Sequence, residues 1–275
     1  MRPSPGKARA PLVALAAAAL LALLFATMID FQSQLIFPTH AVPSPGPLPT
    51  GAVRVTQPTG DGQTLHGVHI PPSRPVPGPA TLVLSFAGNA WNSEDAADYL
   101  HQLYGHAHVV GFHYRGYRPS TGTPSAEALL ADAPRIYDFA VARINPARVV
   151  AVGFSIGTGV AAELARKREL DGLILVTPFD SLKAVASDHY PMLPVGLFFQ
   201  HEMNSAAALR KNEVPVAIVA AERDGLIPKK RTDALRRQVR NLVFDRTIRG
   251  GNHNDIYPRA DFHAAMRQAL DELGS

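Results

Sequence analysis

Ser155 is the residue whose surroundings most directly suggest chemistry. It lies in Gly153-Phe154-Ser155-Ile156-Gly157, which follows the apolar run 148–152 and opens an alanine-rich stretch expected to be helical. On such a strand–turn–helix elbow the serine adopts strained backbone geometry, and the flanking glycines avoid clashes with the neighbouring strand and helix. The hydroxyl then lies at a helix N-terminus, where backbone N–H groups favour a developing negative charge. The pentapeptide alone would also fit an ordinary Gly/Ser turn, but its context predicts a nucleophile.

A serine hydroxyl needs an imidazole to take its proton and a carboxylate to orient that imidazole. Among eleven histidines, His253 has the most suitable place, in the glycine-rich loop 250–255 between the last predicted strand and the last predicted helix. Asp224 follows the apolar run 215–221, so it is expected at the carboxyl end of the sheet. The sequence predicts Ser155, Asp224 and His253 as nucleophile, orienting acid and base. The alternative for His253 is a role in capping the final helix.

Three other carboxylates compete with Asp224 for the histidine. Glu222 lies two residues earlier, Asp245 falls inside the last predicted strand, and Asp180 ends the preceding strand. Asp180 and Ser181 also have the pattern of a helix N-cap. We expect Glu222 and Asp245 to be structural, whereas Asp180 stays an alternative candidate for the acid.

A negatively charged intermediate would need two backbone donors. One is expected from Ile156, directly after the serine. The other is expected from Asn89, in the loop Phe86-Ala87-Gly88-Asn89-Ala90 after the third predicted strand, where glycine permits a close approach to the substrate oxygen. The alternative for this loop is a plain strand-to-helix turn.

Several other chemistries are excluded or disfavoured. The chain has no cysteine, which rules out disulfides, zinc–thiolate sites, iron–sulfur clusters and a cysteine nucleophile. His101, His106 and His108 show no clear metal-ligand spacing, and no phosphate-binding glycine motif is present, so we expect no metal and no cofactor. The net charge is +4, but three basic residues in the first 29 positions account for most of it. No nucleic-acid partner is therefore expected.

Eight short β-branched runs could position these groups: 53–57, 64–70, 81–86, 108–112, 148–154, 173–177, 215–221 and 241–248. The first two are close enough for a hairpin. Helix-length segments separate most of the later runs, at 92–104, 125–143, 156–168, 229–239 and 259–272. This alternation is typical of parallel strands joined by helical crossovers. The sequence therefore predicts an α/β protein with a mostly parallel sheet flanked by helices.

The N-terminal region reads as a membrane anchor. Residues 11–29 carry no charge, and at about 1.5 Å per residue they nearly span a hydrocarbon core of about 30 Å. Arg2, Lys7 and Arg9 precede this segment, whereas the next basic residue is Arg54, which places the N-terminus in the cytoplasm and the rest outside. The alternative is a signal peptide cleaved after Ala26.

This reading divides the chain into four parts. A basic cytoplasmic tail covers 1–10, a single-pass transmembrane signal anchor 11–29, a proline-rich linker 30–51 and a catalytic domain 52–275. The alternating prolines at 43–49 favour an extended tether. The domain is therefore expected on the periplasmic or extracellular side.

At this point the chain resembles the membrane-anchored α/β-hydrolase domain proteins, whose eukaryotic members include protein depalmitoylases. The resemblance covers about residues 31–270 and rests on 31–38, Tyr114-Arg115-Gly116-Tyr117 and 178–182. It implies an α/β-hydrolase fold with an eight-stranded sheet. It also implies a serine hydrolase that cleaves a carboxylic ester or thioester of a small-molecule or lipid-like acyl substrate. Two positions depart from the family pattern, Ala87 in place of histidine and His113 in place of aspartate.

Two alternative functions stay open. A serine peptidase of the same fold would use the same triad, and a membrane-tethered scaffold could retain the fold without catalysis. Ala87 is the feature that favours the scaffold. The sequence does not identify protein partners.

The substrate would meet an apolar stretch at 190–199, between the sixth and seventh predicted strands. Together with Trp91 it is expected to form a hydrophobic acyl channel, with Phe198 in its lining. The alternative is that these side chains pack a short helix onto the domain or rest it on the bilayer.

Overall fold

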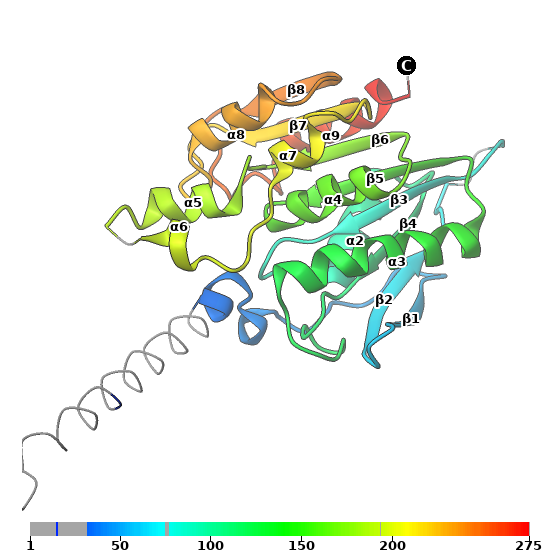
Figure 1. Cartoon of the computed structure of the whole chain (residues 1–275). Helices are drawn as coiled ribbons and strands as arrows, with labels where there is room; N and C mark the ends of the chain where they lie inside the picture. The colour runs from blue at the N-terminus through cyan, green and yellow to red at the C-terminus, as the bar shows by residue number, and fades with distance from the viewer. Residues whose placement is uncertain (1–14, 16–31, 75–76, 193, 275) are drawn as a thin grey trace, which may run out of the picture.

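An eight-stranded sheet forms the centre of the computed structural model, which describes residues 15, 32–74, 77–192 and 194–274 (Figure 1). The strands follow the order β1-β2-β4-β3-β5-β6-β7-β8 across the sheet. Their bounds are Val53–Pro58 (β1), Thr64–Ile70 (β2), Thr81–Phe86 (β3), His108–Phe112 (β4), Arg148–Phe154 (β5), Gly172–Val176 (β6), Val216–Ala221 (β7) and Leu242–Ile248 (β8). Each lies within one residue of its predicted range.

Strand direction also agrees with the prediction. β1 and β2 form an antiparallel hairpin, and β2 pairs antiparallel with β4. All other neighbouring pairs, from β4–β3 to β7–β8, are parallel. The sheet is therefore mostly parallel, and the carboxyl ends of β3, β5, β6, β7 and β8 lie at one edge.

Helices cover both faces of the sheet (Figure 1). α2 (Ser93–Leu103) and α9 (Ala260–Glu272) pack on one face, and α3 (Ala126–Ile144), α4 (Ile156–Lys167) and α8 (Lys229–Arg236) on the other. Alternate strand side chains point to opposite faces, so Leu82 and Leu84 belong to one core cluster and Val83 to the other. Burial on both faces explains the near-continuous apolar runs of β5, β6 and β7.

Three short helices lie between β6 and β7, in the region where the sequence showed an apolar stretch. They are α5 (Leu182–His189), α6 (Val195–Phe198) and α7 (Ser205–Leu209). The Ser181 hydroxyl accepts a 3.2 Å hydrogen bond from the Ala184 N–H and caps α5, as the sequence predicts. We call residues 178–204 the cap.

Residues 32–51 pack against the domain. A helical turn covers 32–36, and the 3-10 helix η1 (Thr39–Ala41) follows it. Phe37 is buried in the core cluster, and the Asn92 amide donates a 3.0 Å hydrogen bond to the carbonyl oxygen of Pro43. Where the sequence suggested an extended tether, this part of the chain contacts the oxyanion-loop side of the domain and the cap. No sequence pattern indicated these contacts.

Among the described residues, none of the helices has the length and apolarity that a membrane crossing requires. The predicted anchor at 11–29 lies outside the described residues except for Leu15.

Candidate active site

Ser155 lies on a sharp turn between β5 and α4. Its backbone has φ +50° and ψ −115°, a left-handed conformation that a residue with a side chain rarely adopts. A Cβ on Gly157 would lie 2.1 Å from the carbonyl oxygen of Phe86, and one on Gly153 would lie 2.5 Å from the carbonyl oxygen of Gly157. Only glycine fits at either position, so the structure explains the spacing of the pentapeptide.

Ser155, His253 and Asp224 are hydrogen-bonded in series. His253 Nε2 lies 2.9 Å from Ser155 Oγ, and His253 Nδ1 lies 2.8 Å from Asp224 Oδ2 and 3.0 Å from Oδ1. Ser155 follows β5, Asp224 lies in the loop after β7, and His253 lies in the loop after β8. These loops meet at the carboxyl edge of the sheet. In this geometry His253 can take the hydroxyl proton while Asp224 stabilises the resulting imidazolium.

The Asp224 carboxylate is held by its own loop. Its Oδ1 accepts hydrogen bonds from the backbone N–H groups of Leu226, at 2.9 Å, and Ile227, at 2.7 Å. Two donors fix the rotation of the carboxylate and leave Oδ2 facing the histidine. Local turn hydrogen bonds therefore orient the acid independently of its contact with His253.

The competing carboxylates have other partners. Glu222 accepts a 2.7 Å hydrogen bond from the Gly250 N–H and so braces the base of the histidine loop. Asp180 pairs with Arg231 at 3.3 Å, and Asp245 pairs with Arg236 at 2.9 Å. Of the four candidates, the structure brings Asp224 alone to the imidazole.

Asn89 and Ile156 border the same cavity as Ser155. The carbonyl oxygen of Gly88 accepts a hydrogen bond from the Trp91 N–H at 3.3 Å. Because the C=O and N–H of one peptide point in opposite directions, this bond turns the Asn89 N–H away from Trp91. The Ile156 N–H lies at the start of α4, where helical N–H groups have no partner within the helix.

Two tyrosines clamp the oxyanion loop, and the sequence analysis did not assign them this role. The Tyr114 hydroxyl donates a 2.8 Å hydrogen bond to the carbonyl oxygen of Ala87, and the Tyr117 hydroxyl donates a 2.9 Å bond to that of Asn89. Burial raises the pKa of both phenols, so they remain protonated donors. Arg115 between them forms a two-point ion pair with Asp132. The Tyr-Arg-Gly-Tyr motif was the sequence feature from which this role of the two tyrosines could have been predicted.

The two departures from the family pattern occupy buried positions near this loop. Ala87 is buried, and its carbonyl is the group that Tyr114 holds. His113 is also buried, with Nε2 3.7 Å from Oε1 of Glu94, which in turn pairs with Arg54. Burial lowers the pKa of His113, and Glu94 opposes that shift only in part. Neither substitution removes a backbone N–H from the loop 86–90, because only the side chains differ from the family pattern.

Trp91 does not line the cavity beside Ser155. Its ring packs behind the elbow, with centroids 5.1 Å from Phe154 and 5.0 Å from Tyr257. The Tyr257 ring belongs to the histidine loop, so this aromatic cluster joins the oxyanion loop, the elbow and the histidine loop. The sequence placed Trp91 in an acyl channel, and the structure instead gives it a packing role.

The cavity beside Ser155 has a volume of about 280 Å³ and is mostly apolar. The cap contributes Leu182, Val185 and Phe199, and the helical turn at 32–36 contributes Leu35 and Ile36. Phe198, which the sequence placed in the lining, is absent from it and is 36% exposed. The neighbouring residue Phe199, at the C-terminal end of α6, lines the cavity in its place.

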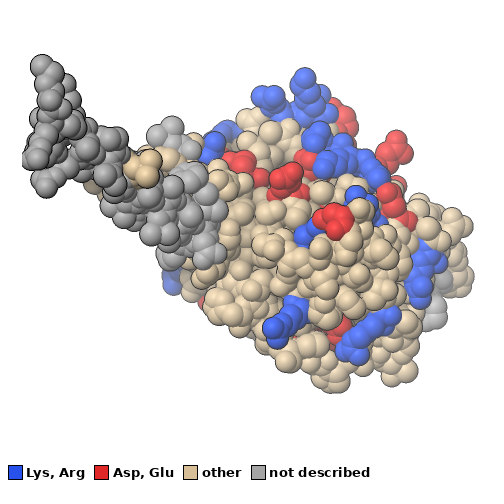
Figure 2. Space-filling view, turned by 60° about the horizontal axis from the view of Figure 1, so that its bottom comes forward, with Lys and Arg blue, Asp and Glu red and all other residues tan. Residues whose placement is uncertain are grey.

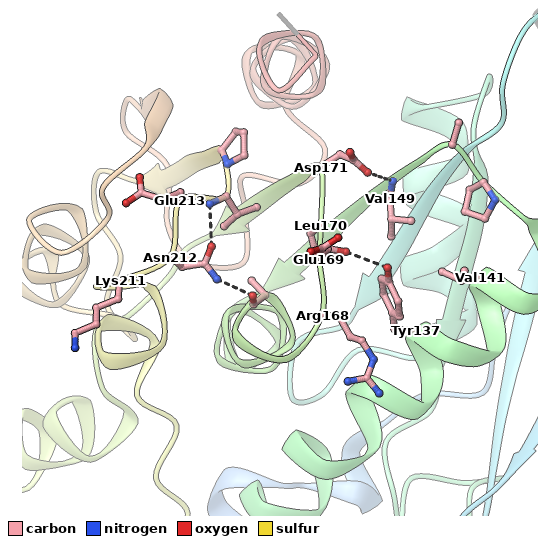
Figure 3. A pocket seen from close by; sticks show the side chains of 15 residues that line it. Tyr137, Val141, Val149, Arg168, Glu169, Leu170, Asp171, Lys211, Asn212 and Glu213 are labelled. Carbon is pink, nitrogen blue, oxygen red and sulfur yellow. Dashed lines mark hydrogen bonds between the residues drawn. The ribbon is translucent and has the colours of Figure 1, made fainter.

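A larger hollow of about 720 Å³ lies elsewhere, at the amino ends of β5 and β7 (Figure 3). Its polar groups are engaged with nearby backbone: Tyr137 donates to the carbonyl of Glu169, Asn212 to that of Ala165, and Asp171 accepts from the Val149 N–H. These bonds tie loops together and present no nucleophile. Within the described part of the chain, no group of three His, Cys, Asp or Glu side chains could hold a metal ion.

Comparison with known proteins indicates the family of the chain. Residues 82–195 match the α/β hydrolase fold family. An uncharacterised protein of Mycobacterium tuberculosis (strain H37Rv) is 32% identical over 252 residues, covering 88% of this chain and 89% of that protein. The chain belongs to the α/β-hydrolase family.

More distant relatives carry functional names. The lysophosphatidylserine lipase ABHD12 of Mus musculus is 35% identical over 139 residues, which cover 44% of this chain and 35% of the lipase. A Pyrococcus furiosus esterase superposes with a TM-score of 0.66 at 16% identity, covering 85% of this chain and 97% of the esterase. Acetyl xylan esterase 1 from Thermoanaerobacterium gives the same TM-score and identity, with coverages of 85% and 87%. At that identity the two structures establish the fold.

Proposed function

We propose that this chain is a serine hydrolase that cleaves a carboxylic ester or thioester. The observation that carries the proposal is the relay from Ser155 Oγ through His253 to Asp224, with distances of 2.9 and 2.8 Å. A strained serine, an imidazole and a fixed carboxylate in this order have the geometry of an activated nucleophile.

The chemistry follows from these positions. His253 Nε2 takes the proton of Ser155 as Oγ attacks the carbonyl carbon, and the backbone N–H groups of Asn89 and Ile156 stabilise the oxyanion. His253 then gives that proton to the departing alcohol or thiol, which leaves an acyl-enzyme on Ser155. A water molecule activated by the same imidazole releases the acid. No cofactor is needed for either half of the reaction.

The substrate we propose is a lipid-like acyl ester, with its acyl chain in the cavity beside Ser155. Leu182, Val185 and Phe199 give this cavity an apolar wall, and apolar walls favour burial of an alkyl chain. The relative named as a lysophosphatidylserine lipase supports a lipid-like ester substrate.

A fluorophosphonate probe tests the nucleophile. We expect the wild-type chain to be labelled, and Ser155→Ala to lose both labelling and hydrolysis of nitrophenyl esters. Ser187→Ala is a matched control, because its hydroxyl only bonds the carbonyl of Lys183 within α5. Labelling that persists in Ser155→Ala would contradict the assignment, and an unlabelled wild type would favour the non-catalytic scaffold.

We also propose that residues 11–29 anchor the chain in a membrane, with the hydrolase domain on the non-cytoplasmic side. The uncharged length of that segment and the basic residues before it support this orientation. A C-terminal reporter that is active only in the cytoplasm should stay silent. An active reporter would contradict the orientation, and a mature N-terminus after Ala26 would contradict the anchor.

A further inference from the structure

The mouth of the cavity beside Ser155 is bordered by apolar side chains that reach the solvent. Leu35, Tyr190 and Leu226 contribute to the cavity lining and are also exposed. Met192, two residues after Tyr190, is 92% exposed. With Phe198 these residues form the set that we call the apolar rim. Among the described residues after position 31, only two other large apolar side chains are comparably exposed, Val53 and Val243.

The rim is one surface assembled from distant parts of the chain. The Gln32 side chain donates a 3.3 Å hydrogen bond to the carbonyl oxygen of Phe198, which joins the helical turn at 32–36 to α6. The Ser33 hydroxyl and His201 Nε2 lie 2.8 Å apart, and the Phe37 ring meets the His201 ring edge-on at 5.2 Å. Figure 1 shows this blue N-terminal segment beside the cap. The segment after the predicted anchor is therefore part of the cavity mouth.

The position of this surface along the chain indicates what covers it. Ile29, the last residue of the uncharged segment, is six residues before Leu35. Even a fully extended chain would span only about 20 Å over that distance. An anchor in a bilayer would thus hold the rim near the membrane surface, where apolar side chains and a tyrosine are favoured.

We propose that the apolar rim docks into the lipid bilayer, so that an acyl chain passes from the membrane directly into the cavity. This inference rests on the proposed hydrolase function and on the proposed anchor. It also explains why apolar side chains are left exposed at the mouth of the cavity beside Ser155, since exposed apolar groups that gather at one place mark interaction sites.

Docking of this kind does not require anionic lipid. In the cap, Asp188 of α5 is paired with Lys230 and Arg231 of α8, at 2.6 and 3.1 Å. The five residues of the apolar rim, of which Met192 is the most exposed, carry no charged side chain. Apolar burial would therefore provide the driving force, and binding should depend little on salt.

Site-specific labelling can test the docking directly, because the chain has no cysteine. Met192→Cys and Phe198→Cys are each labelled with the environment-sensitive fluorophore NBD in the full chain, reconstituted in phosphatidylcholine vesicles. Val243→Cys is the matched control: it is 37% exposed and lies near the amino end of β8, at the edge of the sheet opposite the site.

We expect blue-shifted NBD emission at positions 192 and 198, with quenching by spin-labelled lipid, and water-like emission without quenching at 243. The signal should be unchanged in 0.5 M salt, where a Debye length below about 5 Å screens electrostatic attraction to the membrane. Water-like emission at 192 and 198 would overturn the proposal, as would failure of the full chain to float with the vesicles. A blue shift in vesicles without quenching by spin-labelled lipid would instead indicate burial against a second copy of the chain, and it would also overturn the proposal.

A kinetic comparison links docking to substrate delivery. Met192→Glu should lower turnover of a long-chain ester presented in vesicles at least about fivefold and leave turnover of a soluble short-chain ester unchanged. Val243→Glu should change neither. Equal turnover by Met192→Glu and wild type on the vesicle substrate would contradict direct delivery. The NBD measurement does not depend on catalysis and can be repeated in Ser155→Ala, so a failed hydrolase assignment and a failed docking proposal give different results.

Discussion

The Tyr114 hydroxyl donates a 2.8 Å hydrogen bond to the carbonyl oxygen of Ala87, one residue before the glycine of the oxyanion loop. Tyr117 does the same for Asn89 at 2.9 Å. Two phenols from the loop after β4 (His108–Phe112) thus set the orientation of peptides in the loop after β3 (Thr81–Phe86). This arrangement makes the tyrosines positioning residues for the proposed oxyanion donors.

We predict that Tyr114→Phe lowers kcat for a nitrophenyl ester about tenfold and changes KM less than twofold, because misplaced donors weaken transition-state binding more than substrate binding. Tyr137→Phe is the control, since that hydroxyl donates a 3.0 Å hydrogen bond to Glu169 at the remote hollow. Steady-state kinetics with thermal unfolding measures both effects. Equal kcat losses in the two variants would indicate a merely structural role.

Asp224→Asn should lower kcat by about 10³-fold or more, because an amide can neither select the required tautomer of His253 nor stabilise the imidazolium. The midpoint of thermal unfolding should change little. Glu222→Gln and Asp245→Asn serve as controls, because their carboxylates bond Gly250 and Arg236 instead. A comparable loss in Glu222→Gln with full activity in Asp224→Asn would reassign the acid.

Chain-length selectivity should depend on Phe199 and not on Phe198. In the wild type we expect kcat/KM to rise with each acyl methylene by up to about fourfold, the equivalent of about 0.8 kcal/mol, until the cavity is full. Phe199→Ala should flatten this profile, because its ring lines the cavity, whereas Phe198→Ala should preserve it. Assays with soluble nitrophenyl esters in detergent and EDTA test this. An acetyl-favouring wild-type profile would remove the acyl cavity from the proposal.

Stability should fall as the pH drops from about 6.5 to 5. Burial lowers the pKa of His113 and His201, and it lowers that of His69 to about 4. In this window the unfolded chain binds more protons than the folded chain, so the free energy of unfolding decreases as pH falls. Each such group contributes at most about 1.4 kcal/mol per pH unit. Urea unfolding at pH 5 and 7 measures the slope.

The variant His113→Gln should show a smaller difference between the two pH values than the wild type, whatever its absolute stability. Replacement of the exposed His106 by glutamine should leave the difference unchanged. A wild-type stability that is equal at pH 5 and 7 would contradict the prediction.

Surface charge offers no simple guide to a partner. On the face in Figure 2, Lys and Arg side chains are spread over the surface with Asp and Glu among them, and broad areas carry neither. Elsewhere in the structure, ion pairs such as Arg166–Glu163 and Arg168–Asp138 join opposite charges locally. The features that suggest function are instead the hydrogen-bonded relay and the apolar rim.

Features that depend on local order could be predicted from the sequence. Apolar β-branched runs located all eight strands to within one residue, because burial on both faces of a parallel sheet demands continuous apolar side chains. The elbow at Ser155 could also be recognised, since a Cβ on Gly153 would lie 2.5 Å from the carbonyl oxygen of Gly157, only four residues along the chain. These constraints act over a few residues, so they leave a pattern in the sequence.

Contacts between side chains that are far apart in the sequence depend on the tertiary fold. Glu222 and Asp224 are two residues apart, yet a turn held by Leu226 and Ile227 directs only the second toward His253. Phe198 and Phe199 are adjacent, and the direction in which α6 (Val195–Phe198) ends decides which one reaches the cavity.

The same holds for the contacts made by the segment 32–51 and by the tyrosine clamp. Ser33 meets His201 across 168 positions, and Tyr114 meets Ala87 across 27. Hydrogen bonds between residues so far apart depend on how the loops come together at the carboxyl edge of the sheet. No local pattern of residues in the sequence predicts those contacts. The sequence therefore supplied the strands, the elbow and the candidate groups, and packing selected the partners.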